Sequence, residues 1–258
     1  MSRELQIRDG LLAQQKIVKS LLGDKKKSDK FLATALKVAN DYKLKECHPQ
    51  SIVDACINVA QLNLDLSPSL SHAYLVPFKA KKDAKVANVQ LIISARGYTA
   101  LLSRNGWNVK SFVVNESDTF SYKMNGFDES IVFEKNIDDT DEKFRYAVAL
   151  AKSPNGELFV EVMNKTQIEK HRKVSQNQKG DNPTGVWADW HDEMAKKTVI
   201  KKLVKSLPLG EDIAQATFID DKPIEAEIED MSPQTKPSLN DIPKHNPATG
   251  EVDEDIEV

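Results

Sequence analysis

The spacing of apolar residues changes along the chain, and each change predicts a different element. Apolar positions recur at helical intervals in residues 31–39 and 52–64, whereas alternation in residues 72–78 and 86–94 predicts two strands. A short helix is expected from Ser94 to Asn105. Five strand-like runs then follow: Trp107–Asn115, Phe120–Met124, Ser130–Phe133, Arg145–Lys152 and Leu158–Met163. This order predicts an α+β fold, an antiparallel β-meander or hairpin arrangement packed with helices.

The stretch from Trp187 to Pro208 predicts one amphipathic helix of about six turns. Its apolar side is expected to face the core and consists of Val199, Ile200, Leu203, Val204 and Leu207. A row of lysines spaced four apart lies on the other side and consists of Lys197, Lys201 and Lys205. Such a row is suited to hold a polyanion, although an ordinary solvated helix face has the same pattern.

Charge divides the chain into a basic body and an acidic tail. Residues 1–210 carry 33 Lys and Arg against 25 Asp and Glu, whereas residues 211–258 carry 3 against 14. This asymmetry is typical of proteins whose basic part binds nucleic acid. We therefore expect a helical segment at 1–46, with Lys25–Lys27 in a loop between helices, and a DNA-binding core at 47–210. Residues 211–258 are expected to be a disordered acidic tail for protein partners.

The sequence lacks the signatures of several enzyme classes. No glycine is followed by lysine, so there is no Walker A loop, and neither GxGxxG nor GxSxG occurs. No catalytic residue, cofactor or metal site is therefore expected. Two acidic clusters keep a Mg²⁺ site open as an alternative: Asp138, Asp139 and Asp141, and, beside His191, Asp189, Asp192 and Glu193. Cys47 and Cys56, with no apolar run of membrane-spanning length, favour a cytoplasmic protein without membrane contact.

Basic residues interleaved with aromatic residues are the remaining chemical signal. A cationic groove with ring faces for the bases is how proteins bind single strands without sequence preference. Tyr98 lies between Arg96 and Arg104, and Trp187 and Trp190 precede the lysine row, although these rings could equally belong to the core. The candidate DNA contacts are Lys79, Lys81, Lys82, Arg96, Tyr98, Arg104, Lys170, Arg172, Lys173, Lys196, Lys197, Lys201, Lys202 and Lys205.

Five blocks of the sequence together resemble a known family. SIVDACINVAQLNLDLSP, AYLVPF, LIISARGYTALLSRNGW, VVNESDTF and VWADWHDEMAKKTVIKKLVKSLP are similar, in order and spacing, to the RecT branch of the RecT/Redβ superfamily of phage single-strand annealing proteins. The similarity spans roughly residues 30–210. One departure is Gly185-Val186, where the family usually has Ser-Pro before the tryptophan.

The resemblance implies a protein that binds single-stranded DNA and anneals complementary strands without ATP, through an annealed duplex intermediate. It also implies self-assembly into rings or helical filaments, a core like that of the eukaryotic annealing protein, and a 5′–3′ exonuclease partner. The acidic tail is expected to contact that partner or a host single-strand-binding protein. Two alternatives remain: a single-strand-binding protein that only protects DNA, and a Mg²⁺-dependent nuclease.

Overall fold

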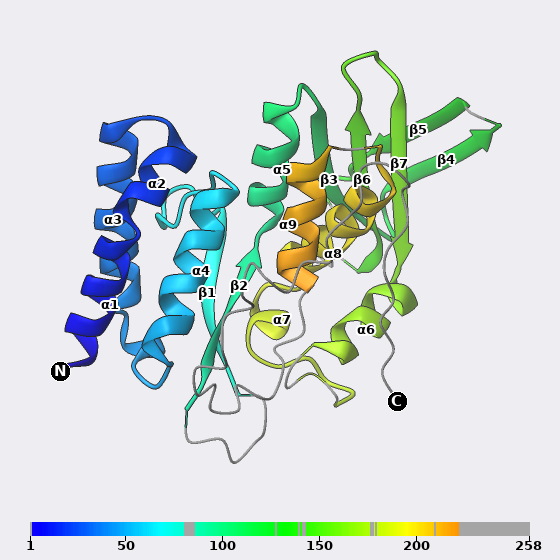
Figure 1. Cartoon of the computed structure of the whole chain (residues 1–258). Helices are drawn as coiled ribbons and strands as arrows, with labels where there is room; N and C mark the ends of the chain where they lie inside the picture. The colour runs from blue at the N-terminus through cyan, green and yellow to red at the C-terminus, as the bar shows by residue number, and fades with distance from the viewer. Residues whose placement is uncertain are drawn as a thin grey trace, which may run out of the picture. The chain divides into compact units, whose positions relative to one another are not determined.

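The computed structural model describes residues 2–79, 86–126, 128–138, 140, 143–175, 178, 180–208 and 210–221 (Figure 1). These residues belong to one compact unit, which extends to Ile224. Helices and antiparallel strands both build it, so the predicted α+β class is confirmed. Within the described residues, no helix combines the length and the apolar character that a membrane span requires.

The N-terminal helices are α1 (Arg3–Ala13), α2 (Gln15–Leu22), α3 (Lys25–Ala39) and α4 (Pro49–Gln61), with a 3-10 turn, η1 (Tyr42–Leu44), before α4. The expected loop at Lys25–Lys27 is instead the first turn of α3. The reason is a cap: the Asp24 carboxylate accepts a hydrogen bond from the Lys27 backbone N–H at 2.7 Å. Pro49 begins α4, where its missing N–H leaves no helical hydrogen bond unmade.

A β-hairpin connects this helical part to the next helix. Strands β1 (Ala73–Phe78) and β2 (Asn88–Ile93) pair antiparallel, with Ala73 opposite Ile93. Helix α5 (Ala95–Arg104) follows at once, capped by the Ser94 hydroxyl, which accepts a hydrogen bond from the Gly97 N–H. A Cβ atom at Gly97 would collide with the carbonyl oxygen of His72. Glycine at this position therefore allows α5 to lie against the hairpin.

The five predicted strand-like runs are all strands, but β3 does not pair with the strand that follows it. Strands β3 (Asn108–Asn115), β6 (Phe144–Lys152) and β7 (Leu158–Asn164) form an antiparallel sheet in the order β3-β6-β7. Strands β4 (Thr119–Asn125) and β5 (Asp128–Glu134) form a separate hairpin (Figure 1). The Phe133 ring stacks on Phe112 of β3 with centroids 4.3 Å apart, which fastens this hairpin to the sheet.

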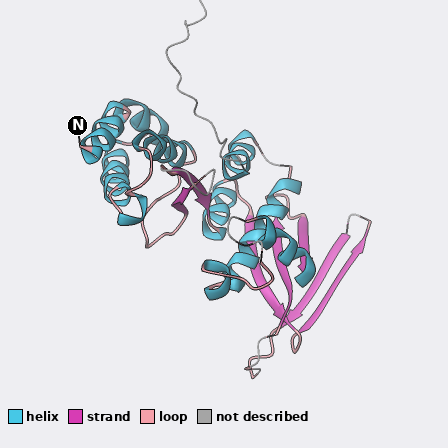
Figure 2. Cartoon of the chain, turned by 90° about the horizontal axis from the view of Figure 1, so that it is seen from below, coloured by secondary structure: helices cyan, strands magenta, loops and turns pink. Residues whose placement is uncertain are grey.

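Helices lie on one face of the sheet (Figure 2). Of these, α8 (His191–Ser206) packs mainly on the central strand β6. Ala147, Ala149 and Ala151 alternate along β6 and are fully buried in the main core. Their small side chains leave room for the predicted apolar side of α8, which is buried as expected and includes Val199, Ile200, Leu203 and Val204. The helix that carries the lysine row is therefore fixed to the sheet.

The stretch from Trp187 to Pro208 is two helices, so the expectation of one continuous helix was wrong. The short α7 (Val186–Asp189) ends at Trp190, whose backbone (φ −137°, ψ 46°) is not helical, and α8 starts at the next residue. Gly185 directly precedes α7 and has φ 54° and ψ −132°, a backbone conformation that residues other than glycine rarely adopt. The chain thus turns twice before it enters α8.

The first part of the segment that was expected to be a disordered tail is helical instead. Residues Glu211–Asp221 form a further helix, α9, which packs on β2 and α8. Ile213 and Ala216 of α9 are buried in the main core. The rest of the acidic segment, residues 222–258, lies outside the described residues.

Candidate nucleic-acid interface

The lysine row of α8, which consists of Lys197, Lys201 and Lys205, lies against the end of α9. Lys201 forms ion pairs with both Asp220 and Asp221, the latter at 2.8 Å. Lys205 pairs with Asp221 at 2.6 Å, and Lys197 lies 3.8 Å from Asp220. Only 17% of the Lys197 side chain and 22% of the Lys201 side chain are exposed. The spacing of the row was thus inferred correctly, but its ammonium groups face carboxylates of the same chain.

Asp220 joins three elements to α9. Its buried carboxylate accepts hydrogen bonds from the Ile93 backbone N–H at 2.9 Å and from the Tyr98 hydroxyl at 3.0 Å. Burial alone would lower the pKa of Lys201, but Asp220 and then Asp221 raise it above its ordinary value. For Lys197 burial dominates and lowers the pKa. Two carboxylates therefore offset part of the charge of these three lysines within the protein.

The aromatic residues near these cations differ in exposure. Tyr98 is fully buried, and burial, followed by Asp220, raises the pKa of its hydroxyl. Trp187 is buried as well, whereas 64% of Trp190 is exposed. In this structure Tyr98 and Trp187 are core residues, whereas Trp190, directly before α8, has an exposed ring.

Helix α6 (Lys165–Val174) carries a second group of predicted contacts, and its arginine is structural. Arg172 is fully buried. Its guanidinium donates to Glu169 at 2.7 Å and to the carbonyl oxygens of Gln178, Gly180 and Asp181 at 3.0–3.1 Å. Five N–H groups in a planar fork suit this task. Arg172 thus fixes the loop between α6 and α7, and it is not accessible to DNA in this structure.

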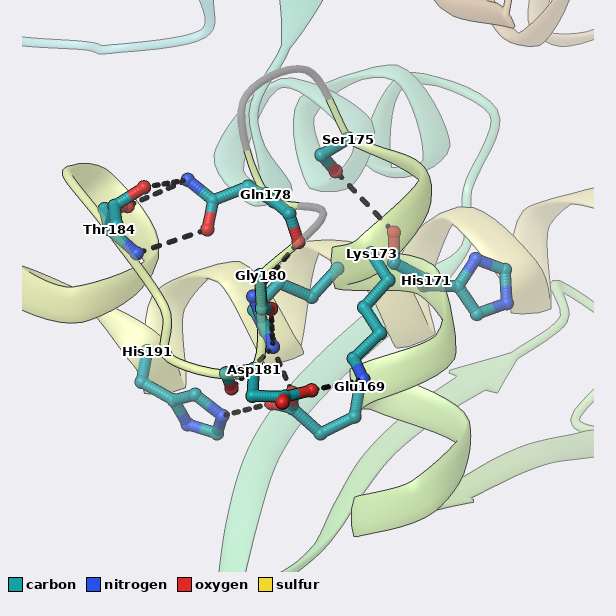
Figure 3. A network of polar contacts seen from close by, with 10 residues as sticks. Glu169, His171, Lys173, Ser175, Gln178, Gly180, Asp181, Thr184 and His191 are labelled. Atoms are coloured by element: carbon teal, nitrogen blue, oxygen red, sulfur yellow. Dashed lines mark hydrogen bonds and ion pairs between the residues drawn. The ribbon is translucent and has the colours of Figure 1, made fainter.

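Neighbouring side chains reinforce the same loop. Gln178 donates to the backbone carbonyl and the hydroxyl of Thr184 at 2.8 and 2.9 Å, and Lys173 pairs with Asp181 at 3.0 Å (Figure 3). The His191 ring contacts Phe144 and Trp187 edge-on and lies 3.9 Å from Glu169. Lys170, in contrast, is exposed and has no ion pair within the described residues.

The two arginines of α5 also have different surroundings. Arg104 donates to the carbonyl oxygens of Leu62 and Asn63 at 2.9 and 2.6 Å, and so satisfies the C-terminal end of α4. Arg96 is exposed in the first turn of α5, and no described residue forms an ion pair with it. Lys79, before the lysine-rich loop, lies 3.4 Å from Glu46. Lys81 and Lys82 lie outside the described residues.

The remaining predicted contacts on α8 have carboxylate partners too. Lys196 pairs with Glu193 of the same helix, and Lys202 pairs with Glu161 of β7 at 2.7 Å. Neither Glu161 nor the two carboxylates of α9 was among the residues predicted from the sequence. Ile213, Ala216 and Ile219 recur at helical spacing and could have indicated α9. The acidic character of residues 211–258 as a whole led instead to the expectation of a disordered tail.

Two of the acidic residues considered for Mg²⁺, Asp192 and Glu193, have other partners. Asp192 approaches His191 at 3.4 Å, and that imidazole, as a hydrogen-bond partner, holds the Asp192 pKa below its ordinary value. Glu193 pairs with Lys196. Across the part of the chain that the structure describes, no three His, Cys, Asp or Glu side chains are grouped to hold a metal. Asp139 and Asp141 lie outside that part.

Comparison with known proteins gives a consistent match. A model of the RecT family matches residues 29–235. The chain is 38% identical over 183 residues to Protein RecT of Escherichia coli (strain K12), which covers 69% of this chain and 65% of that protein. It is 27% identical over 201 residues to Uncharacterized protein YqaK of Bacillus subtilis (strain 168), covering 76% and 65% respectively. The chain thus spans just under two thirds of the length of both relatives.

Proposed function

Because this chain belongs to the RecT family, we propose that it binds single-stranded DNA and anneals complementary strands in homologous recombination without ATP. The family match over residues 29–235 carries the proposal, since it includes most of α3, the sheet and hairpins, and α8 with α9. The sequence supports independence from ATP, because it contains no Walker A loop to hold nucleotide phosphates.

The proposed DNA contacts follow from accessibility. Arg96 and Lys170 are exposed and have no ion pair to another described residue. Lys205, the last residue of the lysine row, has a half-exposed side chain. Trp190 supplies the ring face that Tyr98 cannot supply. We assign phosphate contacts to these three cations and base stacking to Trp190, which is a sequence-independent mode of binding.

The partners of this protein are proposals as well. We expect self-assembly into rings or helical filaments and cooperation with a 5′–3′ exonuclease. The acidic residues 222–258 would contact that exonuclease or a single-strand-binding protein, because their negative charge disfavours DNA. Pull-downs with the full chain and with a chain ending at Ile224 test this role. Equal capture of the exonuclease by both chains would contradict it.

An annealing assay tests the proposed function and its two alternatives. Two complementary labelled oligonucleotides are mixed with the protein, with and without ATP and with and without EDTA, and are resolved on a gel. Full-length duplex should form at the same rate in all four conditions. Binding without duplex formation would indicate a protective single-strand-binding protein. Shortened strands that disappear with EDTA would indicate a nuclease, and dependence on ATP hydrolysis would contradict the proposal.

A further inference from the structure

The two carboxylates that face the lysine row lie at the unfavourable end of their own helix. Asp220 and Asp221 are the last two residues of α9, where the partial negative charge of the helix dipole repels anions. No basic residue lies in the last turn of α9 to offset this repulsion. The cations that offset this repulsion come from α8, whose Lys201 contacts both carboxylates. The end of α9 therefore presents to α8 two anionic groups in the place where a bound DNA backbone would present phosphates.

The two carboxylates are held to different degrees. The Asp220 side chain is 1% exposed and is fixed by Ile93 and Tyr98 as well as by Lys201. The Asp221 side chain is 41% exposed, and its ion pairs are with Lys201 and Lys205. Half of the Lys205 side chain is exposed too. Asp221 can therefore leave the lysines while Asp220 keeps α9 attached to the core.

We propose that Asp221 competes with single-stranded DNA for the same lysines. In the free protein the Asp221 carboxylate pairs with Lys205 and Lys201, and a backbone phosphate replaces it when DNA binds. The inference rests on the proposed function, because it assigns regulation to the same lysine row. Exchange requires only that one anionic oxygen replace another at each ammonium group. An exposed ion pair is weak and is screened by salt, so a polyanion that contacts several cations at once can displace it.

The test compares two neutralising substitutions that change the net charge equally. Asp221→Asn frees Lys205, whereas Asp9→Asn removes a carboxylate from an exposed pair with Arg8 on α1. Asparagine keeps the size of the side chain, and loss of charge at the end of α9 favours the helix. Binding of a fluorescent oligo-dT strand is measured by anisotropy over a range of salt concentrations, and thermal unfolding confirms that each variant is folded.

Asp221→Asn should bind oligo-dT about two- to fivefold more tightly, the range that an exposed ion pair is worth. The slope of log K against log salt should change by less than about 0.7, the value of one phosphate contact, because a phosphate already contacts Lys205 once it has displaced Asp221 in the wild type. Asp9→Asn should bind like the wild type. In a Lys205→Gln background the gain from Asp221→Asn should shrink.

Equal affinities of the two Asn variants for oligo-dT would overturn the competition. Any gain would then come from the change in net charge, which both variants share. An undiminished gain in the Lys205→Gln background would overturn it as well. If the wild type binds oligo-dT and anneals but Asp221→Asn has no effect, the proposed function stands and this inference fails. A wild type that does not bind would refute both.

Discussion

The lysines of α8 and the lysines of α2 and α3 have similar spacing in the sequence but different surroundings in the fold. Each of the five lysines of α8 has a carboxylate within 4 Å: Glu161, Glu193, Asp220 or Asp221. Helices α2 and α3 carry seven exposed lysines, and none forms an ion pair within the described residues: Lys16, Lys19, Lys25, Lys26, Lys27, Lys30 and Lys37. Among the described residues, the lysines of α8 therefore form ion pairs that connect parts of the fold, and the lysines of α2 and α3 form none.

The difference shows what a row of charges on a helix can and cannot indicate. Helical spacing places Lys26 and Lys30 on one side of α3 as surely as it places Lys197 and Lys201 on one side of α8. What lies opposite each row depends on tertiary packing. Packing brings α9 to the lysines of α8, and it leaves the lysines of α3 exposed to solvent. The substitutions below sharpen this contrast, because removal of a paired charge should affect stability and removal of an unpaired one should not.

The largest loss of stability is expected for Arg172→Ala. The change leaves three loop carbonyls and the Glu169 carboxylate without their donor, so we expect a loss of about 3–4 kcal/mol in the free energy of unfolding. Lysine cannot reproduce the fork, so Arg172→Lys should recover little. Urea unfolding measures both variants. Lys170→Ala on the same helix is the matched control, and an Arg172→Ala variant as stable as this control would contradict the structural role.

Asp220→Ala should have the next largest effect. It removes the acceptor of the Ile93 N–H and the Tyr98 hydroxyl and leaves Lys201 with Asp221 as its partner. We expect a loss of about 2–3 kcal/mol, again from urea unfolding. Asp221→Asn, which changes an exposed group next to it, should lose less than about 1 kcal/mol. Equal losses for the two variants would show that Asp220 is not the anchor of α9.

A smaller effect is expected in the acid range. Burial would raise the pKa of Asp221, but hydrogen bonds from Lys201 and Lys205 outweigh it and hold the pKa below its ordinary value. A carboxylate with a lowered pKa in the folded state stabilises the protein above its unfolded pKa, about 3.9, and loses this contribution as pH falls through the folded value. Between about pH 5 and pH 3, the wild type should therefore lose more stability than Asp221→Asn. Identical losses would indicate that Asp221 is not paired in solution.

Much of the fold could be predicted from local patterns. Alternation located all five strands from β3 to β7, and helical spacing located the buried side of α8. Periodicity does not identify partners, however. Nothing in the local pattern indicates that β3 pairs with β6 across an inserted hairpin. The break at Trp190 is likewise a property of the backbone, which the residues around it do not reveal.

The candidate site was predictable in part, for the same reason. Lys197, Lys201 and Lys205 share one side of their helix as expected, but no local pattern indicates that α9 covers it. Nor does a local pattern distinguish Arg172, a fully buried donor to a loop, from Lys170, an exposed residue two positions earlier. Because residues 211–258 are strongly acidic as a whole, the apolar residues within 211–221 were not interpreted as a helix. Whether the accessible cations contact DNA stays a prediction.

The most direct test of the pairing between α8 and α9 is the melting temperature of Lys201→Gln beside that of Lys26→Gln. Sequence alone would treat both as neutral surface substitutions. Lys201→Gln leaves the buried Asp220 carboxylate with Lys197 at 3.8 Å as its nearest ammonium group, at a cost of about 2 kcal/mol. The account therefore predicts a Tm about 4–8 °C below that of the wild type. It also predicts an unchanged Tm for Lys26→Gln. A Lys201→Gln variant that melts with the wild type would contradict the account.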